Sequence, residues 1–79
     1  MKDIKRGSTG EDVKILQACL RMLHYTGADD KPIEIDGHAG QNTIAAVNKF
    51  QMTEGKYGYE CGNGDGVFGA KCWARMLGV

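Results

Sequence analysis

The sequence has no excess charge of either sign and no long apolar run. Ten basic residues balance ten acidic ones in a chain of 79 residues, so the formal net charge is zero. Proteins that bind nucleic acid draw affinity from clustered Lys and Arg, which argues against nucleic acid as the main partner. No apolar run approaches the roughly 20 residues that a membrane-spanning helix needs. The composition is that of an ordinary soluble globular domain with no membrane span.

The first residues, Met1–Arg6, lack the apolar stretch of an export signal, so no signal peptide is expected. The chain is therefore expected to be cytoplasmic, to leave the cell by another route, or to be a module of a longer protein. The 79 residues make one domain, 1–79, near the lower limit for folding on a single core without help.

The cysteine spacing argues against the common zinc and redox motifs. Cys19, Cys61 and Cys72 contain no Cys-x-x-Cys pair. Cys61 and Cys72 could form a disulfide if their loop folds onto the last helix, but free thiols are the preferred interpretation. His24 and His38 lack a second ligand at metal-binding spacing, so no metal and no cofactor are expected.

The most informative feature present is a repeated turn signal, Asp-Gly-x-x-Gly, which a helical pattern follows each time. The first copy spans Asp36–Gly40, and the second spans Asp65–Gly69, 29 positions later (65 minus 36). Glycine tolerates positive φ, and aspartate accepts hydrogen bonds from backbone N–H groups in turns. The repeat therefore predicts a duplicated turn–helix unit.

Amphipathic periodicity predicts an all-α fold of three helices joined by Gly-rich turns and loops, without a substantial sheet. The expected helices are about 11–25, 41–54 and 70–77. Ser8 or Thr9 is expected to cap the first helix, Gly27 to end it, and Gly55 to end the second. The alternation around Ile33 would suit a short extended piece. The residues expected to face the core are Ile4, Val13, Leu16, Leu20, Leu23, Thr43, Ala46, Val47, Phe50, Phe68, Trp73, Met76 and Leu77.

Four segments, taken in order, carry a family resemblance. They are Ile4-x-x-Gly7-Ser8-x-Gly10-x-Asp12-Val13-x-x-Leu16-Gln17, Leu20-x-x-Leu23-x-Tyr25, Asp36-Gly37-x-x-Gly40-x-x-Thr43-x-x-Ala46-Val47-x-x-Phe50-Gln51 and Asp65-Gly66-Val67-Phe68-Gly69-x-x-Cys72-Trp73-x-x-x-Leu77. Together they resemble the small peptidoglycan-binding domain, a three-helix wall module attached to many bacterial and phage lytic enzymes. The chain departs from that pattern at Ala39, where an aromatic is usual, at Cys72, where threonine is usual, and in two longer loops.

The resemblance implies a compact three-helix domain that binds bacterial cell-wall peptidoglycan and is not itself an enzyme. Such a domain would target an attached or partner wall-lytic enzyme to its substrate, in the cell wall or outside the cell, as part of a larger protein or phage lysin. Asp36 and Asp65 are expected to cap their turns rather than to serve as the acid and base of a glycosidase.

Six residues are candidate contacts for a glycan strand or stem peptide: Tyr25, His38, Gln41, Asn42, Tyr57 and Tyr59. Aromatic rings can cover the apolar faces of sugars while their polar tips form hydrogen bonds. Gln41 and Asn42 open the second helix, where exposed N–H groups attract a carboxylate such as that of a stem peptide. A merely solvated helix end remains the alternative, and Trp73 is more readily explained as core than as a contact.

A protein-docking module of similar shape, dockerin-like and either calcium-dependent or calcium-independent, is the alternative function. Asn63 and Asp65 fit positions 3 and 5 of a calcium-binding loop. Cys61 and Cys72 would then occupy positions 1 and 12, where calcium requires hard oxygen ligands. This mismatch disfavours the calcium-dependent version.

Overall fold

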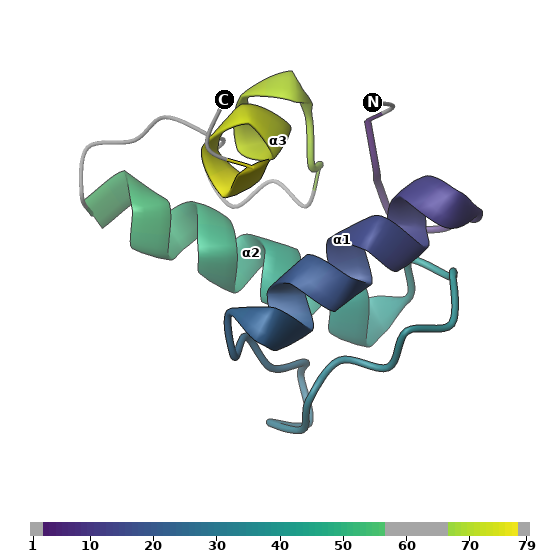
Figure 1. Cartoon of the computed structure of the whole chain (residues 1–79). Coiled ribbons are helices and arrows are strands. Elements are labelled where there is room, and N and C mark those ends of the chain that lie inside the picture. The colour runs from purple at the N-terminus through teal and green to yellow at the C-terminus, as the bar shows by residue number, and fades with distance from the viewer. Residues whose placement is uncertain (1–2, 57–66, 78–79) are drawn as a thin grey trace.

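The computed structural model describes residues 3–56 and 67–77, and these form an all-α domain with three helices. The helices are α1 (Glu11–Met22), α2 (Gln41–Lys56) and α3 (Ala70–Leu77). Figure 1 shows α1 crossing α2, with α3 viewed nearly end-on and the α1–α2 connection looping beneath α1. Outside the helices, the described ranges contain isolated β-bridges and no strand. The all-α prediction is confirmed, and the described helices include none long and apolar enough to cross a membrane.

The predicted bounds of α3 are confirmed, whereas α1 ends earlier than expected. Its end is set by His24, whose φ of 65° is left-handed. The His24 N–H donates to the Arg21 carbonyl (3.1 Å), and the Tyr25 N–H donates to the Leu20 carbonyl (2.9 Å). This pair of bonds is a Schellman motif, in which glycine usually takes the left-handed position. The prediction that Gly27 ends the helix was therefore wrong.

The other two predicted helix signals were also wrong. The residue preceding α1 is Gly10, with φ 116° and no side-chain cap, while the Ser8 hydroxyl accepts the Lys5 N–H instead (3.0 Å). Gly55 does not stop α2, which continues to Lys56. A single glycine inside a helix costs only about 1 kcal/mol, and this cost is small enough for the helix to continue.

The core contains most of the residues that the periodicity selected. Its buried apolar members are Ile4, Val13, Leu16, Leu20, Ile33, Ala39, Ala46, Val47, Phe50, Phe68, Cys72 and Trp73. Leu23 and Leu77 were predicted wrongly, since they are 51% and 47% exposed. Leu23 lies beyond the last α1 residue, where the helical stripe no longer applies. Around Ile33 an isolated bridge forms between Thr26 and Pro32, in place of a strand.

Four aromatic rings pack in series through this core. The ring centroids are 5.7 Å apart for Tyr25 and Phe50, 5.8 Å for Phe50 and Phe68, and 4.8 Å for Phe68 and Trp73. Trp73 is 4% exposed, so its interpretation as a core residue is confirmed. The series joins the α1–α2 connection to α2 and α3.

The N-terminal segment pairs with the first turn and with Phe68, which lies just before α3. Ile4 and Phe68 exchange backbone hydrogen bonds of 3.0 and 2.7 Å. The Gly7 N–H donates to the Ala39 carbonyl, and the Ala39 N–H donates to the Ser8 carbonyl, both at 2.9 Å. Ala39 and Phe68 occupy equivalent places in the two copies. The described part of the second copy, Val67–Gly69, is thus held in a manner similar to the first.

Candidate functional site

The first turn is held against α1 by one buried side chain, that of Gln17. Its Oε1 accepts the N–H groups of Asp36 and Gly37 at 3.0 and 2.9 Å. Its Nε2 lies 2.9 Å from Asp36 Oδ1, 3.0 Å from the His38 carbonyl and 3.0 Å from Thr43 Oγ1. The periodicity does not place Gln17 among the residues expected to face the core. In the fold, its amide fixes the turn from which α2 begins.

Asp36 caps the turn, as predicted. Its carboxylate accepts the His38 N–H at 3.0 Å, and Gly37 has the expected positive φ of 77°. The His38 N–H, and after it the Gln17 amide, hold the pKa of Asp36 below its ordinary value, because both donate to the charged form. The carboxylate is therefore expected to be charged at neutral pH and already engaged within the turn.

Gln51 on α2 makes corresponding contacts with the segment that leads into α3 and with α3 itself. Its Nε2 lies 2.8 Å from the Val67 carbonyl and 3.4 Å from Cys72 Sγ. Val67 and Cys72 stand 29 positions after His38 and Thr43, the two equivalent acceptors for Gln17 (67 minus 38 and 72 minus 43). Both glutamines directly follow a buried apolar residue, Leu16 or Phe50, and this shared pattern is the sequence signal that could have identified them.

A hollow of about 330 Å³ opens beside the first turn, where α2 begins. We call it the α2 groove. It is lined by Asp29, Lys31, Pro32, Ile33, Glu34, Asp36, His38, Gly40, Gln41, Asn42 and Thr43. Three of the predicted contacts, His38, Gln41 and Asn42, meet here and are exposed. The α1–α2 connection forms the opposite wall.

The α2 groove is polar and carries both signs of charge. Asp29, Glu34 and Asp36 supply three carboxylates, of which Asp36 is already engaged within the turn, and Lys31 supplies one ammonium group. The α2 N-terminus adds backbone N–H groups that lack helical partners by position. Such a surface suits a ligand that carries both hydrogen-bond donors and acceptors, or charges of both signs.

Tyr25 lies at a neighbouring hollow rather than in the α2 groove. This hollow, of about 290 Å³, is bordered by Arg21, His24, Tyr25, Thr26 and Pro32. Pro32 borders both hollows, so the two adjoin across it. The Tyr25 ring is half-buried with its edge interaction to Phe50, which leaves part of the side chain accessible.

Tyr57 and Tyr59, the other two predicted contacts, lie outside the described residues. The same holds for Cys61, Asn63 and Asp65, so the disulfide and calcium-loop hypotheses remain untested predictions. Within 3–56 and 67–77, no group of three or more His, Cys, Asp or Glu side chains is placed to hold a metal ion.

A slightly larger hollow, about 370 Å³, lies at the start of α1. Asp3, Glu11 and Asp12 border it and make it acidic, and none of the predicted contacts lies there. We favour the α2 groove despite its smaller volume, because the groove combines three predicted contacts with donors and charges of both signs.

Comparison with known proteins supports a family assignment. No solved structure matches the chain. A protein of Kitasatospora aureofaciens, described as "Uncharacterized protein in bpoA1 3'region", is 35% identical over 74 residues, which cover 92% of this chain and 53% of that protein. The chain thus spans about half the length of this curated relative. The family described as "Putative peptidoglycan binding domain" matches residues 9–55, which include α1, the first turn and nearly all of α2. The chain therefore belongs to the peptidoglycan-binding domain family.

Proposed function

We propose that the domain binds bacterial cell-wall peptidoglycan through the α2 groove and catalyses no reaction itself. One observation carries this proposal: every residue that lines the groove lies within the segment, 9–55, that matches the family. The groove also contains His38, Gln41 and Asn42, three of the contacts that the sequence predicts.

Peptidoglycan offers the groups that the α2 groove can pair. A stem-peptide carboxylate would lie at the α2 N-terminus, where Gln41 and Asn42 begin the helix and Lys31 adds a positive charge. Amide or ammonium donors of the peptide would face Asp29 and Glu34. The half-buried ring of Tyr25, across Pro32, would contact an apolar sugar face.

The affinity of this surface is expected to be modest. A small open groove buries little area, and the favourable contacts must first offset the loss of translational and rotational freedom on binding. A weak module is still useful when it is linked to a catalytic domain, since the linkage raises the enzyme's local concentration at the wall. We propose that the domain targets an attached or partner wall-lytic enzyme in this way, at the cell wall or outside the cell.

Sedimentation with purified insoluble peptidoglycan tests the function. We expect the domain to pellet with the wall at low and moderate salt. A domain that stays in the supernatant under both conditions would refute peptidoglycan binding.

Paired variants test the site. Lys31→Ala combined with Gln41→Ala should reduce the pelleted fraction, because both residues line the α2 groove. Lys5→Ala combined with Met52→Ala is the matched control, since it removes the same charge and both side chains are exposed elsewhere. Equal losses in the two pairs would argue against the α2 groove.

The tyrosines outside the described residues have their own test. Tyr57→Ala with Tyr59→Ala should weaken sedimentation while the far-UV circular dichroism spectrum stays unchanged. Full retention of binding would remove that loop from the proposed site.

A further inference from the structure

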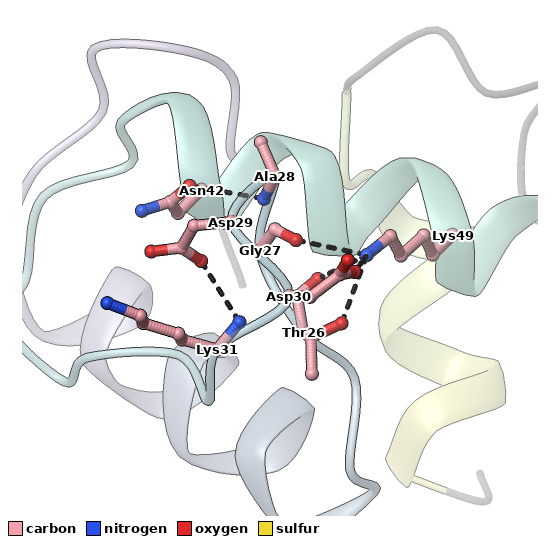
Figure 2. Close-up of polar contacts among 8 residues, drawn as sticks. All are labelled: Thr26, Gly27, Ala28, Asp29, Asp30, Lys31, Asn42 and Lys49. Carbon is pink, nitrogen blue, oxygen red and sulfur yellow. Dashed lines mark hydrogen bonds and ion pairs between the residues drawn. The ribbon is translucent and has the colours of Figure 1, made fainter.

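One lysine on α2 attaches the α1–α2 connection to the helix. Lys49 Nζ lies 3.1 Å from the Thr26 carbonyl, 3.0 Å from Thr26 Oγ1 and 3.0 Å from the Gly27 carbonyl. Asp30 Oδ1 lies 3.6 Å away as an ion-pair partner. Figure 2 shows these oxygens converging on the ammonium group. An ammonium group has three N–H donors, so Lys49 can satisfy three close oxygens at once.

Asn42, which lines the α2 groove, makes a second contact between α2 and the α1–α2 connection. Its Oδ1 accepts the Ala28 N–H at 3.1 Å (Figure 2). Gly27 is buried against the same side chain: a Cβ added at Gly27 would lie 2.6 Å from Asn42 Cβ. Asn42 and Lys49 are seven positions apart (49 minus 42), which is two helical turns, so both lie on one face of α2. Gly27 thus allows the connection to approach this face closely.

The segment that these contacts hold, residues 26–32, separates the two hollows. Asp29, Lys31 and Pro32 line the α2 groove, while Thr26 and Pro32 line the hollow beside Tyr25. Residues 28–32 are exposed, so little apolar burial fixes their position. The 26–32 segment is consequently held to α2 mainly by polar contacts.

The backbone of this segment also needs external support. Asp30 has a φ of 59°, a left-handed conformation that costs energy in residues other than glycine. The Asp30 N–H donates to the Gly27 carbonyl at 3.1 Å, and the Gly27 N–H donates to the Lys31 carbonyl at 3.1 Å. The Gly27 carbonyl is also an acceptor for Lys49. Lys49 therefore contacts the tight turn at the point where its internal bonds meet.

We propose that Lys49 is a positioning residue for ligand binding. It holds the 26–32 segment where that segment walls the α2 groove, so peptidoglycan meets a preformed site and does not have to order the wall on binding. The inference rests on the proposed function. Preorganisation raises affinity by removing an ordering cost from the binding step, without any contact between Lys49 and the ligand.

The test compares the affinity of purified variants for soluble disaccharide-peptide fragments of digested peptidoglycan. Lys49→Met keeps the length of the side chain and removes its donors, and we expect Kd to rise roughly tenfold. Lys5→Met is the charge-matched control, because Lys5 is exposed on the N-terminal segment and its Kd should stay near that of the unmodified domain. Asp30→Asn should have a smaller effect than Lys49→Met, since the three closer oxygens remain.

A second variant displaces the 26–32 segment without a change of charge. Gly27→Ala places a methyl group against Asn42 and should push the 26–32 segment away from α2, which raises Kd while Lys49 is intact. Lys49→Arg should restore affinity only in part, because a planar guanidinium fits three converging oxygens less well than an ammonium group.

Amide hydrogen exchange separates a positioning role from a general loss of stability. In Lys49→Met the Ala28 N–H should exchange faster in the free domain, protection should return at saturating ligand, and Tm should change little. A Lys49→Met domain that binds as tightly as the unmodified one, or whose Ala28 exchange is unchanged, would overturn this inference alone. Failure of the unmodified domain to bind any fragment would overturn the proposed function and this inference together.

Discussion

Replacement of Gln17 by leucine tests whether one buried amide holds the first turn. The Gln17→Leu variant fills a similar space with an apolar side chain and removes every hydrogen bond of the amide. The Gly37 N–H loses its acceptor in a buried position, and the Asp36 N–H loses its acceptor in a partly buried one. The His38 carbonyl loses one donor but keeps the Gly40 N–H. The Thr43 hydroxyl retains the His38 carbonyl as a partner at 3.5 Å.

The expected cost follows from how many of these groups water can reach. A buried donor without an acceptor costs about 1–3 kcal/mol, and partly buried groups cost less because water replaces the lost partner. The estimated loss of unfolding free energy is about 2–4 kcal/mol for the whole set. A domain of this size has a total stability of about 4–12 kcal/mol, so the variant would lose a large share of it.

Urea unfolding followed by circular dichroism measures this loss, and the m-value should stay near that of the unmodified domain. Thermal unfolding should show a Tm lower by roughly 10–30 °C. Gln41→Leu is the control, because Gln41 is exposed and should change stability by less than about 0.5 kcal/mol. A loss below about 1 kcal/mol in Gln17→Leu would show that the turn does not depend on the amide.

Three further predictions concern single backbone or titrating positions. Gly37→Val should lower the unfolding free energy by roughly 1–3 kcal/mol, because φ is 77° there, and an unchanged melting curve would refute the left-handed assignment. His24→Gly should raise it by roughly 0.5–1 kcal/mol in urea unfolding, since glycine relieves a left-handed residue at the end of α1; a loss would contradict this. Asp36 has a depressed folded-state pKa, so its stabilising contribution is present above its unfolded pKa, near pH 4, and is lost as pH falls through the lower folded pKa. Between pH 2 and 6, Tm should therefore fall less on acidification in Asp36→Asn than in the unmodified domain. Parallel plots of Tm against pH for the two proteins would refute this role of Asp36.

The fold was predictable where apolar periodicity controls it, and less so at helix ends. The buried faces of α1 and α2 follow from spacing, because each stripe must meet a neighbour to leave water. The end of α1 depends instead on the φ of one residue, His24, and histidine carries no strong signal for a left-handed position. Gly27 was predicted to end the helix because glycine is common at helix ends. Its lack of a Cβ instead allows a close approach to Asn42.

The candidate site was predictable only where its residues are neighbours in the chain. His38 lies within the first turn, and Gln41 and Asn42 follow it directly, so locating the turn locates all three. The contact of Lys49 with Thr26 spans 23 residues and depends on how the α1–α2 connection folds back, which no local pattern encodes. Tyr25 was predicted as a contact because of its aromatic ring. In the fold this ring packs against Phe50, and Tyr25 borders a separate hollow and not the α2 groove.

The two copies of the Asp-Gly-x-x-Gly sequence differ at the position that precedes the last glycine. Phe68 fills the second copy, where its ring packs against those of Phe50 and Trp73. Ala39 stands at the equivalent place in the first copy and is equally buried, but it has no ring to fill the surrounding space. A further hollow of about 270 Å³ lies beside Ala39 and shares His38 and Gly40 with the α2 groove, so the first turn borders open space in two hollows. Gln17 already accepts the N–H groups of Asp36 and Gly37, so the first turn is held without a ring at position 39, and we propose that the space is available to a ligand.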